Sequence, residues 1–538
     1  MDKLITQNRV KIDTLFIAIF SILISFLFFG KTLNSQMGII DDHTYFARSV
    51  LTDTSAVWKN FINAPEIKSF GNSPRFRIIY DLINNTETLV FRTNASYWYL
   101  TNIFVFAFFI FTVFYLTYKN LNIKWAIPFT LYVISSSYFA LIFTRLGTAE
   151  VWTILGCSIY ALGFNSLYHK SKSSKTYSEW KEWLAMILGA IIAIGSKENF
   201  AVMGVLFITI FIILKLRHKI SFLTILSTIF LLFINCFQIL DIYLTQKNNG
   251  VDYYQNNSET IYRITKVVSG LFLQETRPYT TSLIIFIFIL ILFYFLVIKT
   301  NKKNLQFKLL ISYFITPLVT TLVLAAILIF NLYIYNGTLN TTNRYAFPSV
   351  LITQIQLLVI SRWFYNILSR KNKLYTSILF FSIFLISIPV LLFKDYSNLK
   401  YSRDMSTKNV EATNLFQNKL TEIVKLTKKN PDYPIVFSSY QPFDYEPMVS
   451  IKIYLRYSNI YNTLMVKTNY NKEITTDNPL SKWVMDENFK FEKSGGNGFT
   501  SYGLKKDEKC FLIDFNGTTT DTQCENLGKI WQLGSYPY

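Results

Sequence analysis

Side chains able to carry chemistry occur in short groups beside long apolar runs. The densest group is Asp41-Asp42-His43, shortly after the first apolar run. Adjacent carboxylates repel each other, which favours base chemistry near neutral pH, and a neighbouring histidine would orient the base. The competing interpretation is an exposed loop start or a helix N-cap, where Asp is favoured.

Two further groups combine a base and an acid. Arg145 and Glu150 lie between two apolar runs, and the simpler interpretation is an ion pair at a helix turn. Glu150 would also suit the positive N-terminal end of the following helix. Lys197-Glu198 lies inside a long apolar stretch, where an ion pair would be desolvated at a cost. For this pair the sequence favours a functional role.

Arginines form the remaining groups. Arg344-Tyr345 precedes an apolar run, and the guanidinium of Arg344 would match phosphate oxygens. An interfacial Arg-Tyr anchor is the equally weighted alternative. Arg75 and Arg77 would share one side of an extended segment, facing phosphate or lipid headgroups.

The elements that must position these groups are predicted to be membrane helices. Hydrophobic residues make up 51% of the 538 residues and charged residues 16%, against about 25% charged residues in soluble proteins. Apolar runs of this kind must be helical in lipid. The sequence therefore predicts a polytopic α-helical membrane protein with about eleven spans, at 13–30, 100–118, 123–143, 149–168, 184–196, 200–214, 220–240, 280–298, 309–334, 346–361 and 374–393.

Lysine and arginine set the predicted orientation. One alternating set of connections holds twenty of these residues, whereas the short connections of the other set hold only Arg145, Lys197 and Arg344. Because basic connections stay inside, the N-terminus is predicted to be cytoplasmic. The long segments 31–99, 241–279 and 394–538 then lie outside. The net charge of +20 comes from these clusters, so nucleic acid is not an expected partner.

The same rule divides residues 184–214. One long helix would place two basic connections on opposite sides of the membrane. Two short helices that meet at Ser196-Lys197-Glu198-Asn199 keep both connections inside, so we expect a buried turn there.

Residues 394–538 are predicted to be a small extracytoplasmic α/β domain, separate from a transmembrane domain at 1–393. Helices are expected at 405–428 and 445–457, and strands at 434–437, 463–466 and 510–515. Cys510 and Cys524 would lie in an oxidising compartment and are candidates for a disulfide.

Missing motifs narrow the function. The chain has no GxxxxGK[ST] loop, no dinucleotide fingerprint and no HExxH, and only three histidines. ATP-driven transport by this chain alone is not expected. Group transfer outside the cell would need a membrane-borne donor.

The layout and the motifs Asp41-Asp42-His43, Arg75-Phe76-Arg77, Arg145-Leu146-Gly147 with Glu150, Lys197-Glu198 and Arg344-Tyr345 resemble the polytopic glycosyltransferases of the GT-C fold. That family carries an acidic motif in the first outer loop and uses a lipid-phosphate sugar. Bacterial members that add glucose from undecaprenyl phosphate to O antigen are similar in size and layout. Lipid A modification and protein mannosylation are sister activities.

The resemblance implies an inverting transfer from a polyprenyl-phosphate sugar to a cell-surface glycan, at the outer face of a bacterial inner membrane. Asp41 or Asp42 would be the base. The donor phosphate would meet Arg344, Lys197, Arg145, Arg75 and Arg77, and His43, Glu150, Glu198 and Tyr345 would orient substrate. Use of a divalent cation stays open; its ligands would be Asp41, Asp42, His43 and Glu150. A companion flippase and a donor synthase are implied partners.

Three other classes compete. A surface-polysaccharide polymerase would carry its arginines in large central outer loops, whereas the largest outer segment here is C-terminal. A lipid-linked sugar transporter or flippase would show repeats and mid-membrane charges. A simple membrane anchor would not need eleven helices.

Overall fold

A computed structural model describes residues 2–38, 42, 45–46, 62, 65–68, 70–71, 76–170, 179–217, 221–249, 354, 373–439, 445–468, 499–501, 508–513, 519–524 and 530–533. The chain divides into two compact units. The helical unit comprises Met1–Gly30, Ser55–Asn84 and Tyr99–Ser406. The sheet unit comprises Lys31–Thr54, Asn85–Trp98 and Thr407–Tyr538, and so includes parts of the predicted outer loop 31–99.

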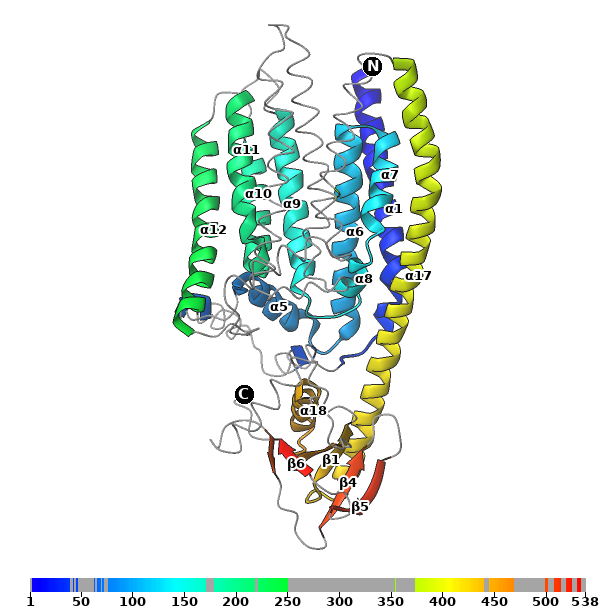
Figure 1. The fold of residues 1–538 in the computed structure, drawn as a ribbon, viewed down its shortest axis with the longest axis vertical. Helices are drawn as coiled ribbons and strands as arrows, with labels where there is room; N and C mark the ends of the chain where they lie inside the picture. The colour runs from blue at the N-terminus through cyan, green and yellow to red at the C-terminus, as the bar shows by residue number, and fades with distance from the viewer. Residues whose placement is uncertain are drawn as a thin grey trace, which may run out of the picture. The chain divides into compact units, whose positions relative to one another are not determined.

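Helices form nearly all of the described part of the helical unit, and the longer ones run side by side (Figure 1). They are α1 (Asp2–Phe29), α4 (Pro65–Lys68), the start of α5 (Ile78–Phe91), most of α6 (Ala95–Asn120), α7 (Ile123–Ile134), α8 (Tyr138–Phe143), α9 (Ala149–Lys170), α10 (Trp180–Ser196), α11 (Met203–Arg217), α12 (Phe222–Asn249) and the start of α17 (Lys373–Thr427). There are also two 3₁₀ segments: η2 (Glu198–Val202) lies in the helical unit, and η1 (Gly30–Asn34) begins there and continues into the sheet unit.

Four segments among the described residues are long and apolar enough to cross a membrane: Ile12–Asn34, Ala95–Asn120, Ala149–Lys170 and Phe222–Thr245. The protein is therefore a helical membrane protein. The predicted spans at 280–298 and 309–334 lie outside the described residues, as does nearly all of the span at 346–361.

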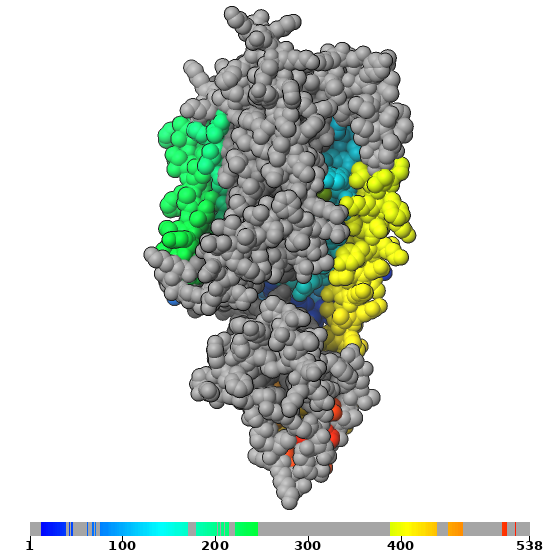
Figure 2. Space-filling view, in the orientation of Figure 1, coloured from blue at the N-terminus to red at the C-terminus, as the bar shows by residue number. Residues whose placement is uncertain are grey.

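Helix α12 shows the reversed amphipathic pattern of a lipid-facing helix. Phe222, Phe233 and Leu226 are exposed, whereas the buried side carries Asn235 and Gln238. Figure 2 shows the surface of this part of the chain in green. Apolar side chains on the outside and polar ones within suit a bilayer rather than water, because lipid tails do not penalise exposed apolar groups.

Helices α9 and α10 approach each other until their backbones touch. A Cβ at Gly156 would lie 2.5 Å from the Gly189 carbonyl oxygen, and one at Gly189 would lie 2.5 Å from the Tyr160 nitrogen. Only glycine fits at such a crossing, and small residues let membrane helices pack this closely. The crossing fixes the N-terminal half of α9 against the C-terminal half of α10.

The predicted single helix at 123–143 is wrong, since α7 and α8 are separated at Ser135–Ser137. The Ser135 hydroxyl donates to the Tyr132 carbonyl at 2.8 Å. Serine side chains compete with the helical backbone in this way, and three consecutive serines therefore interrupt the helix.

The predicted gap between the span at 374–393 and a helix at 405–428 is also wrong. Helix α17 is continuous from Lys373 to Thr427. Residues 394–404 contain neither glycine nor proline, so nothing in their sequence ends the helix.

The sheet unit contains a six-stranded sheet in the order β3-β6-β2-β1-β4-β5. The strands are β1 (Ile435–Ser439), β2 (Leu464–Thr468), β3 (Phe499–Ser501), β4 (Lys509–Ile513), β5 (Thr519–Gln523) and β6 (Ile530–Leu533). The central strands β2, β1 and β4 are parallel, and the outer pairings are antiparallel. Helix α18 (Tyr445–Tyr457) connects β1 and β2.

The strands expected at 434–437, 463–466 and 510–515 are present as β1, β2 and β4, and the helix expected at 445–457 is α18. Cys510 of β4 and Cys524, next to the end of β5, form a disulfide with their Cα atoms 5.5 Å apart. Both cysteines are buried, with Val436 and Met465, in the core of the sheet.

Candidate functional site

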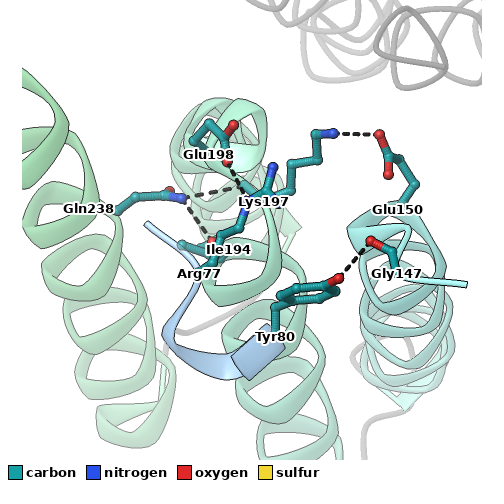
Figure 3. A network of polar contacts seen from close by, with 8 residues as sticks. All are labelled: Arg77, Tyr80, Gly147, Glu150, Ile194, Lys197, Glu198 and Gln238. Carbon is teal, nitrogen blue, oxygen red and sulfur yellow. Dashed lines mark hydrogen bonds and ion pairs between the residues drawn. The ribbon is translucent and has the colours of Figure 1, made fainter. Parts of the chain in front are cut away.

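Four charged side chains gather in the helical unit where α10 ends. Lys197 and Glu198 follow α10, Glu150 lies in the first turn of α9, and Arg77 precedes α5 (Figure 3). Lys197 has an extended backbone, with φ −152° and ψ 134°, so the chain leaves the helix for one residue before η2 begins. The two short helices predicted to meet at residues 196–199 are therefore confirmed.

Lys197 and Glu150 form the innermost ion pair of the cluster. The Lys197 Nζ donates to Glu150 Oε1, and each side chain is only 2% exposed. Ion pairs removed from water lose hydration that their mutual attraction must replace, so neither partner can be lost without leaving a buried charge. This pair joins the start of α9 to the turn between α10 and α11.

Arg77 and Glu198 form the second pair, nearer the surface. Arg77 Nε lies 3.5 Å from Glu198 Oε2, and the side chains are 17% and 10% exposed. The Arg77 guanidinium lies over the Tyr80 ring, 5.7 Å from its centroid, and the Tyr80 hydroxyl donates to the Gly147 carbonyl at 2.6 Å. A cation over an aromatic face is attracted to it, so Tyr80 helps to place the guanidinium.

Gln238 of α12 closes the cluster from a third side. Its Nε2 donates to the Ile194 carbonyl at 2.8 Å and to the Lys197 carbonyl at 3.4 Å. The last carbonyls of a helix have no intrahelical partner, so Gln238 supplies one for α10. Its Oε1 is buried and accepts no hydrogen bond among the described residues.

The ion-pair partners differ from the simplest interpretation of the sequence. Glu150 contacts Lys197 rather than Arg145, and Glu198 contacts Arg77 rather than its neighbour Lys197. Adjacent residues on an extended backbone point to opposite sides, which separates Lys197 from Glu198. The Arg145 side chain is exposed, and its carbonyl accepts from Asn102 at 3.3 Å.

The acidic motif belongs to the sheet unit. Asp42 is 8% exposed, and its Oδ2 accepts the Gly38 N–H at 2.8 Å. Asp41, His43, Arg75, Arg344 and Tyr345 lie outside the described residues. The structure therefore brings together Arg77, Glu150, Lys197 and Glu198 of the predicted set.

Among the described residues, no three His, Cys, Asp or Glu side chains are close enough to hold a metal ion. Of the four predicted ligands, Asp41 and His43 are not described, and Glu150 is engaged with a lysine. The described residues give no support to a divalent cation at Glu150.

Sequence reasoning missed Tyr80 and Gln238. Gln238 had a signal, because it lies in the apolar run 220–240 only three residues after Asn235. Polar residues three apart share one face of a helix, and at membrane depth such residues are rarely accidental. Tyr80 had no comparable signal among the many tyrosines of the chain.

No protein-family model matches the chain, and no curated protein matches it significantly. The class of the protein is therefore defined by its own fold and site. It is a helical membrane protein with a buried cluster of two basic and two acidic side chains.

Proposed function

We propose that the protein is a GT-C-like glycosyltransferase with about eleven membrane spans. In this proposal it moves a sugar, with glucose the first candidate, from a polyprenyl-phosphate donor to a cell-surface glycan. The observation that carries the proposal is the charged cluster of Arg77, Glu150, Lys197 and Glu198. Ionisable groups inside helical membrane proteins are costly and usually serve substrates or ions.

Arg77 is the cation best suited to a lipid phosphate. Its side chain keeps 17% exposure, whereas Lys197 is 2% exposed. Guanidinium matches phosphate geometry, and the contact of Arg77 with Glu198 is long enough, at 3.5 Å, to be exchanged for a stronger one. In this proposal Lys197 does not contact the donor phosphate. Its ion pair with Glu150 fixes the turn that carries Glu198.

In the proposed reaction the base is Asp41 or Asp42, as the resemblance to GT-C enzymes implies. The carboxylate takes the proton of an acceptor hydroxyl, whose oxygen bonds to the anomeric carbon. The bond between that carbon and the phosphate oxygen breaks, and polyprenyl phosphate leaves with the electron pair. Fixed positive charge at the phosphate stabilises this developing anion. Retention of the carboxylate proton until product release balances the step.

The proposal includes a location. The basic connections would lie in the cytoplasm of a bacterial cell, and the acidic motif and the sheet unit outside its inner membrane. The donor would reach this side through a companion flippase after its synthesis within the cell.

The test is sugar transfer by the purified protein in lipid nanodiscs. The assay uses a short-chain polyprenyl-phosphate glucose and measures polyprenyl phosphate released with an isolated surface-glycan acceptor. Asp41→Asn and Asp42→Asn test the base. Arg77→Gln tests the phosphate contact, and Lys124→Gln, which removes an exposed positive charge at the start of α7, is its matched control.

We expect loss of transfer in at least one Asp variant. Arg77→Gln should lower kcat/KM about 10- to 100-fold, the contribution of one charge-assisted hydrogen bond, whereas Lys124→Gln should be unchanged. Equal activity of all four variants would remove these residues from the chemistry. Glycan chains that lengthen without a new sugar would indicate the polymerase. Donor that crosses the bilayer without cleavage would indicate the transporter or flippase.

A further inference from the structure

The segment that leads into the acidic motif is held by residues from the far end of the chain. Within the sheet unit, residues 31–38 make five hydrogen bonds to α17 and α18, which follow them by more than 370 residues. These join Lys31 to Thr407, Ser35 to Asn409, Gln36 to Thr413, Met37 to Gln417 and Gly38 to Tyr454. Nearly every residue of the segment's second half is thus fixed.

Three of the partners share one face of α17. Asn409, Thr413 and Gln417 recur every four residues, the spacing that aligns side chains on a helix. The Thr413 hydroxyl accepts the Gln36 N–H at 3.1 Å, and the Gln417 amide donates to the Met37 carbonyl at 2.5 Å. Residues 35–37, which follow η1, therefore lie along this face of α17.

Tyr454 of α18 makes the last and most buried contact. Its side chain is 1% exposed, and its hydroxyl donates to the Gly38 carbonyl at 2.8 Å. Its ring packs on Phe46, at 4.4 Å between centroids, and on Phe416, at 5.3 Å. Tyr454 thus contacts the chain both before and after the acidic motif, and joins α18 to α17.

Gly38 links Tyr454 to Asp42 of the acidic motif. Its N–H donates to Asp42 Oδ2 at 2.8 Å, while its carbonyl accepts from Tyr454. A Cβ at this position would lie 3.0 Å from Thr413 Cγ2 and 3.3 Å from Asp42 Oδ2. The backbone of Gly38 therefore connects the carboxylate of Asp42 to Tyr454 of α18, and a side chain at position 38 would crowd Thr413 of α17.

We propose that Tyr454 and Gln417 are positioning residues that, through residues 37 and 38, hold Asp42 of the acidic motif in place from α18 and α17. The C-terminal segment is then part of the catalytic apparatus rather than an independent outer domain. The effect on transfer rests on the glycosyltransferase function proposed above, whereas the effect on the order of the segment does not.

The test combines two measurements on the full-length protein in nanodiscs: amide hydrogen exchange of residues 31–38 and sugar transfer. Tyr454→Phe removes one hydroxyl and keeps the ring contacts. Tyr461→Phe is its matched control, because Tyr461 is 74% exposed. We expect about two- to tenfold faster exchange and a similar fall in kcat for Tyr454→Phe, the range of one hydrogen bond, with the donor KM unchanged.

A rescue experiment separates positioning from general damage. Gly38→Ala would place its methyl against Thr413 Cγ2, and Thr413→Ser removes that methyl but keeps the hydroxyl that accepts from Gln36. The double variant should recover both exchange protection and transfer relative to Gly38→Ala alone.

The outcomes are distinct. Exchange that is the same in Tyr454→Phe and Tyr461→Phe, or Gly38→Ala behaving like wild type, overturns the positioning role. Faster exchange at 31–38 with kcat intact also overturns it, since the segment would then be held for stability alone. If wild type transfers no sugar but the exchange changes occur, the glycosyltransferase function fails while the anchoring of the segment stands.

Discussion

The ion pair between Lys197 and Glu150 offers the sharpest test of the fold. Glu150→Gln leaves the ammonium group of Lys197 without its carboxylate in a site where each side chain is 2% exposed. Breaking a buried pair on one side costs about 3–5 kcal/mol, because the remaining charge stays desolvated. We expect the free energy of unfolding to fall by about that amount.

Replacing both partners should cost much less. In Glu150→Gln/Lys197→Met neither side chain is charged, so the double variant avoids the cost of a buried unpaired charge that the single variant carries. The matched control is Lys419 with Glu422 on α17, a pair 3.0 Å apart whose side chains are 15% and 42% exposed. Its loss should cost about 1 kcal/mol or less.

The assay is unfolding by SDS titration in mixed micelles, followed by tryptophan fluorescence, to which the buried Trp183 of α10 contributes. A double-mutant cycle gives the coupling of the two residues. The reasoning is refuted if Glu150→Gln costs no more than the control pair, or if the double variant is as unstable as the single one.

Three other predictions concern different parts of the chain. Gly189→Leu should prevent α9 and α10 from packing, because its Cβ would lie 2.5 Å from Tyr160 N; protease resistance of the reconstituted protein measures this, with the exposed Leu188→Ala as control. Burial raises the pKa of Glu87 to about 8. Its neutral form is therefore favoured by the fold, and stability should fall as pH rises from about 4.5 to 8, by up to about 5 kcal/mol. Thermal unfolding of Glu87→Gln should show a weaker dependence of stability on pH. The same pH dependence in wild type and variant would contradict the prediction. Cys510→Ser should destabilise the sheet unit by about 2–4 kcal/mol. In unfolding experiments, reductant should lower the stability of wild type and leave that of the variant unchanged.

The sequence predicted elements best where local patterns decide structure. The break at Lys197 followed from charge placement, and β1, β2, β4 and α18 followed from apolar runs and helical periodicity. Strands β3, β5 and β6 were missed because they are only three, five and four residues long, and because β5 (Thr519–Gln523) contains no apolar residue. Such strands form because a neighbouring strand offers hydrogen bonds, a cause that local sequence does not contain.

The candidate site was predicted in its residue types and not in its pairings. Lys197 and Glu198 are adjacent in sequence, yet each bonds a residue from another element. Partner choice depends on which helices meet, and that depends on contacts such as Gly156 against Gly189. The contacts of residues 31–38 with α17 and α18 were equally hidden, because they join residues more than 370 positions apart.

The polar face of α12 has a consequence for the biogenesis of the protein. Asn235 donates to the Ala201 carbonyl, Gln238 to that of Ile194, and Asp241 accepts the Gly71 N–H. Alone in lipid, these side chains would have no such partners, and polar groups without hydrogen-bond partners are costly in a bilayer. We therefore expect α12 to insert into the bilayer only after α10 and α11 have inserted. If the helices assemble in chain order, the helices already inserted would supply hydrogen-bond partners to the polar side chains of the next one.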